Sequence, residues 1–141
     1  MRQSNSHLRF GWWSLLAYLS LGLALDLLHG FKLGWYLDAG NEVRRLMLTL
    51  AHAHGTLVGL VNVIAGLTLR TLPGLRFSRS ASLALRSAGV VLPLGFLCGA
   101  FRIHGGDPGV AVFLVPLGAL LLIYGVGGAM RAVVAATQEE S

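Results

Sequence analysis

Residues 46–69 of this 141-residue chain read LMLTLAHAHGTLVGLVNVIAGLTL, and this stretch decides the fold. It carries no acidic residue, lysine or arginine, and it exceeds the ~20 residues that a helix needs to cross ~30 Å of hydrocarbon. Three further apolar segments cover residues 10–28, 83–101 and 110–130. Because backbone groups in lipid need hydrogen-bond partners within their own segment, we predict that all four segments are helices.

The overall composition agrees with a membrane protein. The chain is 55% hydrophobic and 12% charged, with a mean hydropathy of +0.69, whereas a soluble domain carries roughly 25% charged residues. We find no internal repeat or linker. Residues 1–141 are therefore predicted to form one all-α, four-span transmembrane domain.

Basic residues favour one orientation of these spans. Alternating helix ends place the two termini and the loop at 70–82 on one face, together with seven of the eleven basic residues: Arg2, Arg9, Arg70, Arg76, Arg79, Arg86 and Arg131. Lys and Arg accumulate on the cytoplasmic side, so both termini are predicted to be cytoplasmic, as in a multi-pass protein of the bacterial inner (plasma) membrane. The basic loops suit anionic lipid headgroups, and we expect no nucleic-acid partner.

Glycines indicate how the spans pack. Small residues allow close approach of helices in membranes, and several of the 19 glycines share helical faces: Gly55, Gly59 and Gly66; Gly95 and Gly99; Gly118 and Gly125. Pro93 and Pro116 are expected to bend their helices. We predict a compact antiparallel four-helix bundle with up-and-down topology.

His52 and His54 stand out because ionisable side chains are costly at membrane depth. On a helical wheel His52 shares the small and polar face of segment 46–69, with Asn62 at its border. His54 points about 200° away, so the two rings cannot bind one metal ion from a regular helix.

Other polar residues are predicted on the outer side, where His52 lies only ~9 Å inside the helix start. His29 ends the first span and His104 follows the third. Imidazoles from separate helices can ligate haem iron or copper, so His52, His54, His29 and His104 are the candidate ligands. Asp26, Asp107 and Asn62 are candidates for orienting a ring or carrying a proton. His7 lies on the opposite side and is set aside.

The segment His52-Ala53-His54-Gly55-Thr56-Leu57-Val58-Gly59 resembles the His-Ala-His-x-x-Leu-x-Gly segment of haem- and copper-containing membrane proteins of the nitric-oxide response family. It is similar, more loosely, to His-x-His segments in relatives of the haem–copper oxidase subunit I. The resemblance covers one span of four. It implies ligation of haem or metal by His52 and His54 and a link to respiratory or nitrogen-oxide chemistry.

Three functions remain open from the sequence. The first is a small membrane protein that binds haem b or copper near the outer face for electron transfer or sensing. The second is a non-catalytic accessory or assembly subunit, packed as a homo-oligomer or within a larger respiratory-type membrane complex. The third is a proton-coupled carrier that uses Asp26 and His52 as its relay. No hydrolase triad, phosphate loop or acidic pair is visible, so enzymatic activity is not expected.

Overall fold

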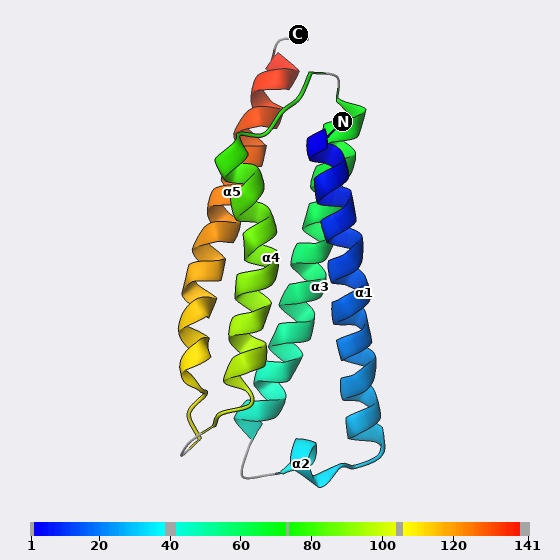
Figure 1. The fold of residues 1–141 in the computed structure, drawn as a ribbon, viewed down its shortest axis with the longest axis vertical. Coiled ribbons are helices and arrows are strands. Elements are labelled where there is room, and N and C mark those ends of the chain that lie inside the picture. Colours follow the sequence, from blue (N-terminus) through cyan, green and yellow to red (C-terminus); the bar gives the residue numbers. More distant parts are fainter. Residues whose placement is uncertain (1, 39–41, 73, 104–105, 139–141) are drawn as a thin grey trace.

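The computed structural model describes residues 2–38, 42–72, 74–103 and 106–138. The expected helices on the candidate segments are present (Figure 1), and the described residues contain no β-strand. The elements are α1 (Arg2–Gly30), the short α2 (Gly34–Leu37), α3 (Glu42–Thr71), α4 (Arg79–Gly99), the 3-10 helix η2 (Val110–Phe113) and α5 (Leu114–Gln138).

Four helical segments are long and apolar enough to cross a membrane: α1, α3, α4, and the continuous segment formed by η2 and α5. The predicted segments are therefore helices, but the bounds differ because a helix continues past its apolar part. α1 already begins at Arg2 and α5 runs on to Gln138. Polar residues at a helix end remain hydrated, so they lengthen a helix without having to enter lipid.

The four long helices pack together, as the predicted four-helix bundle requires, but they form an open row and not a compact bundle. α1 packs on α3, α3 on α4 and α4 on α5, while α1 and α5 form no comparable interface between their described residues. Neighbouring helices run in opposite directions, and both termini lie at the same end (Figure 1). The up-and-down order of the helices is thus as predicted. The row stays open because α1 and α5 each pack along a single face.

The glycine faces lie at the helix contacts of this row. A Cβ added at Gly66 would lie 2.7 Å from Leu8 Cγ of α1. A Cβ at Gly118 would lie 2.6 Å from Leu92 Cα of α4, which is backbone and cannot rotate aside. The predicted role of these glycines in close helix packing is therefore confirmed.

The two prolines occupy different settings. Pro93 is a buried residue inside α4, and this helix continues through it to Gly99. Pro116 lies in the first turn of α5, just after the change from 3-10 to α-helix at Leu114. A proline is tolerated in a first turn because its missing N–H would have no intrahelical partner there. Pro116 therefore marks the start of α5 and not a bend inside a longer helix.

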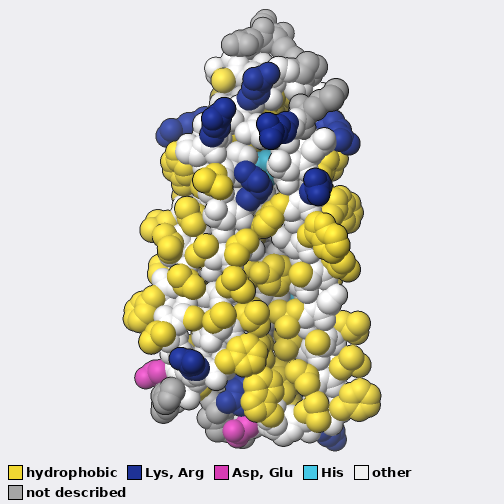
Figure 2. Space-filling model, in the orientation of Figure 1, with side chains coloured by type: hydrophobic (Ala, Val, Ile, Leu, Met, Phe, Trp, Pro, Cys, Tyr) yellow, Lys and Arg dark blue, Asp and Glu magenta, His cyan; other side chains and the backbone are white. Residues whose placement is uncertain are grey.

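The two ends of the row differ in charge. Arginines gather at the end that carries both termini, an apolar band covers the middle, and acidic side chains appear at the opposite end (Figure 2). The basic end consists of the seven arginines named above, and the described acidic residues are at the other end: Asp26, Asp38, Glu42 and Asp107. This distribution is the one from which the sequence predicted the orientation of the spans.

Candidate functional site

The side chain of His52, a residue of α3, lies in the contact between α3 and α1. Its ring is partly buried, and Nδ1 donates a hydrogen bond of 2.7 Å to the backbone oxygen of Tyr18. Gly22 of α1 makes room for the ring, because a Cβ at this position would collide with the imidazole. A carbonyl oxygen can only accept, so Nδ1 carries a proton, and in the neutral form of the ring the lone pair is on Nε2.

His54 turns to the other side of α3. Its Nδ1 donates to the backbone oxygen of Leu50 at 2.9 Å, one turn earlier on the same helix. The ring lies against Phe96 of α4, with 5.0 Å between the ring centroids and an interplanar angle of 32°. α3 remains helical through both histidines. The two rings therefore face different helices, as the wheel indicated, and His54 also keeps its lone pair on Nε2.

The described candidates His29, Asp26 and Asp107 lie at the end opposite the termini. His29 and Asp26 are exposed on α1, and the His29 ring meets the edge of Tyr36 of α2 at a centroid distance of 6.4 Å. Asp107 is exposed. His104 lies outside the described residues, so the structure does not place it.

These positions bear on a metal or haem centre in two ways. The tautomers of His52 and His54 suit ligation, since each offers an unprotonated Nε2. Among the residues that the structure describes, however, no three His, Cys, Asp or Glu side chains come together as a metal site. The described part of one chain thus supplies ligand chemistry but no three-ligand site, and a haem held by two histidines stays a prediction.

The most deeply buried histidine is His7, which sequence reasoning set aside. It is 0% exposed, and its ring links three helices. Nδ1 lies 2.8 Å from Asn62 Oδ1 of α3, and Nε2 lies 2.7 Å from Ser82 Oγ of α4. Asn62, which we had associated with the outer histidines, is hydrogen-bonded to His7 and lies on the half of α3 nearer the basic end.

The hydrogen bonds of Asn62 determine which atoms of this His7–Asn62–Ser82 network carry protons. Asn62 Nδ2 lies 2.9 Å from Val58 O and 3.3 Å from Leu85 O, and both carbonyls require a donor. Oδ1 must then face His7, so His7 Nδ1 carries a proton and donates it. In the neutral ring, Nε2 accepts from the Ser82 hydroxyl. Both ring nitrogens are therefore used, and the network holds α1, α3 and α4 together.

Comparison of the chain with protein-family models, with curated proteins and with solved structures gives no match. The resemblance to the nitric-oxide response family consequently stays a prediction that rests on residues of α3. A function has to be argued from the geometry described above.

Proposed function

We propose that the protein is a multi-pass protein of a bacterial inner membrane and acts as an accessory or assembly subunit. In this proposal α5, at the edge of the row, binds a helix of a partner subunit or of a second copy. Four helices that are long and apolar enough to cross a membrane support the location. The setting of Gly127 supports the contact.

Gly127 differs from the other glycines of α5. Gly118, Gly125 and Gly128 press against α4, whereas a Cβ added at Gly127 would meet no atom within 4 Å. Gly127 lies one or two helical turns from four exposed large side chains on the outer face of α5: Leu120, Ile123, Tyr124 and Met130. A glycine inside a helix lowers helix stability by about 1 kcal/mol relative to alanine. Its usual role on a membrane helix is to let another backbone approach.

The histidines at the helix contacts fit the same proposal. His7 and His52 bind groups of neighbouring helices, and His54 is hydrogen-bonded within α3 while its ring packs on α4. Polar side chains of this kind hold membrane helices in register. A fixed row of helices presents the outer face of α5 as a rigid surface for a partner.

One substitution can remove the proposed contact of α5 without disturbing the fold of the chain. Gly127→Leu adds a bulky side chain where the proposed partner helix would approach α5. Because the added Cβ meets no atom and leucine favours helix, the isolated chain should remain folded. We expect the wild type to run in mild detergent as an assembly larger than its 15.0 kDa mass, and Gly127→Leu to run as the single chain. Ala17→Leu, on the exposed side of α1, is the matched control and should not dissociate the assembly.

The measurement is size-exclusion chromatography with light scattering, which gives the protein mass free of detergent. A multiple of the chain mass indicates copies of this chain, and any other mass indicates a different partner. A monodisperse wild-type single chain, or an assembly that survives Gly127→Leu, would contradict the proposed contact.

A second candidate is binding of haem b or copper, favoured by the Nδ1 hydrogen bonds of His52 and His54, which leave Nε2 of each neutral ring as the ligating atom. Hydrogen bonding of the other ring nitrogen to a carbonyl is typical of metal-ligating histidines. His52 or His54 would hold the group, and the remaining ligands would come from His104, His29 or a second chain. The bound group would supply one-electron chemistry for electron transfer or sensing.

Visible spectra and metal analysis of the purified chain test this candidate. We expect a Soret band or bound copper in the wild type, lost in His52→Ala or His54→Ala and retained in Thr56→Ala on the same helix. A colourless, metal-free wild-type protein would rule the candidate out.

A further inference from the structure

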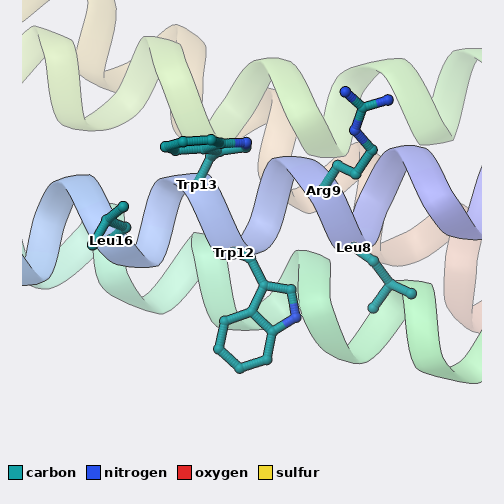
Figure 3. Close-up of a pocket in the computed structure, with 5 residues that line it drawn as sticks. All are labelled: Leu8, Arg9, Trp12, Trp13 and Leu16. Carbon is teal, nitrogen blue, oxygen red and sulfur yellow. The ribbon is translucent and has the colours of Figure 1, made fainter.

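An open hollow lies on the outer face of α1 near the basic end. It has a volume of about 460 Å³ and is lined by Leu8, Arg9, Trp12, Trp13 and Leu16. Figure 3 shows that the two indoles leave α1 in opposite directions, with Arg9 on the side of Trp13 and Leu8 on the side of Trp12. Trp12 is 62% and Trp13 69% exposed. Two wide aromatic walls thus frame a surface that the described residues do not cover.

An apolar stripe continues from this hollow along α1. Exposed leucines follow at helical spacing, and they are Leu16, Leu19, Leu23 and Leu27. The helical rise places Leu16 and Leu27 about 16 Å apart, which is close to half of the ~30 Å hydrocarbon thickness. The stripe therefore spans the depth that one leaflet's acyl chains occupy.

The charge around the hollow determines whether an anion or a cation would bind there. Arg9 belongs to the basic end, where the described residues include seven arginines and no acidic side chain. Arg70 is held at the same end of α1 by a 3.0 Å hydrogen bond to Asn5 Oδ1. The charge that the described residues place around the hollow is therefore positive and favours an anion. Tryptophan also prefers the headgroup level of a bilayer, where its ring is apolar and its N–H is hydrated.

We propose that this hollow is a binding site for one anionic phospholipid. Arg9 contacts the headgroup phosphate, and the walls formed by Trp12 and Trp13 receive the glycerol region. An acyl chain then runs over Leu16 along the leucine stripe. This inference rests on the proposed membrane location. It adds a specific position to the membrane location. A uniformly basic surface would attract anionic lipids everywhere, whereas the hollow places a positive charge next to an apolar groove at one position.

Tryptophan fluorescence reports on this site directly. The chain has 3 tryptophans, so Trp35→Phe leaves only Trp12 and Trp13. The variant is placed in phosphatidylcholine bilayers that contain increasing amounts of brominated phosphatidylglycerol or, in parallel, brominated phosphatidylcholine. Bromine on an acyl chain quenches an indole that it touches. We expect phosphatidylglycerol to bind about five-fold more strongly than phosphatidylcholine, the preference that one basic residue at the surface supplies.

Two arginine variants in the Trp35→Phe background test the role of the hollow. Arg9→Gln should reduce the five-fold preference to about one. Arg131→Gln removes the same charge at the same end but on α5, at the other edge of the row, and should preserve the preference. An equal loss in both variants would mean that diffuse surface charge attracts the lipid, and it would overturn the proposed site.

The quenching also separates this inference from the membrane location on which it rests. Equal quenching by both lipids in the Trp35→Phe protein would place the indoles in the bilayer and overturn only the headgroup site. An absence of quenching by either lipid would place the hollow outside the bilayer, and both the site and the proposed span of α1 would then fail.

Discussion

Replacement of Asn62 by alanine removes the residue that connects His7 to α3. Asn62 is 0% exposed, and its carboxamide accepts from His7 Nδ1 and donates to Val58 O and Leu85 O. Val58 O and Leu85 O also lie within helices, where backbone N–H groups serve them. The loss therefore falls mainly on His7, whose buried Nδ1–H is left without an acceptor.

Two estimates bound the effect of Asn62→Ala. A buried donor without a partner costs about 1–3 kcal/mol. Hydrogen bonds between membrane helices average about 0.6 kcal/mol and reach about 1.7 kcal/mol. We expect the free energy of unfolding to fall by about 2 kcal/mol, inside the first range and just above the second, because one substitution affects contacts with both α1 and α4.

Equilibrium unfolding in mixed micelles titrated with sodium dodecyl sulfate, followed by far-UV circular dichroism, measures this change. Asn5→Ala is the matched control, since Asn5 is exposed and accepts only an exposed bond from Arg70, and it should change the unfolding free energy by less than about 0.5 kcal/mol. A double-mutant cycle with His7→Ala should give a coupling of about 0.6–1.7 kcal/mol. Equal effects of the two asparagine substitutions, or strict additivity in the cycle, would refute the reasoning.

Three further outcomes follow from the same structure. Ser82→Ala should lower the unfolding free energy by about 1 kcal/mol, less than Asn62→Ala, because it leaves His7 Nε2 as an unpaired acceptor and no unpaired donor. Gly118→Leu should cost about 1–3 kcal/mol, since its Cβ would lie 2.6 Å from Leu92 Cα, whereas Gly127→Leu should cost nothing in the same titration. Reporter fusions should place both termini in the cytoplasm, with alkaline phosphatase active when fused after Leu37 and inactive when fused after Gln138, because seven of eleven basic residues lie at the end with the termini.

The parts of the fold that the sequence predicts are those set by hydrophobicity. Apolar length alone located the four long helices, and spacing of small residues located the faces around Gly66 and Gly118. The helix ends could not be placed in the same way. Helix α1 continues past its apolar part through polar residues as far as Arg2, and the apolar pattern does not mark where the helix ends.

Sequence reasoning missed His7 because it ranked histidines by their side of the membrane. A signal was present in the spacing of Ser4, His7, Gly11 and Ser14, which are small or polar and recur every three or four residues. All four are buried in the structure. A stripe of small residues on an otherwise bulky helix marks its packing face, and a histidine within that stripe has to find partners on the neighbouring helices.

The open row has a cause in the number of packing faces that each helix carries. Within their apolar windows, α3 and α4 are 44% and 56% buried, whereas α1 and α5 are 17% and 11% buried. α3 uses Gly59 toward α1 and Val58 toward α4 and therefore packs on both sides. A helix with two packing faces takes an interior place, and a helix with one face takes an edge.

A closed bundle would require a second small-residue face on α1 and on α5. α1 instead carries leucines and two tryptophans on its outer side, which suits lipid, while α5 carries Gly127. The two edges are thus chemically different, and α5 is the edge at which the proposed partner helix would join the row.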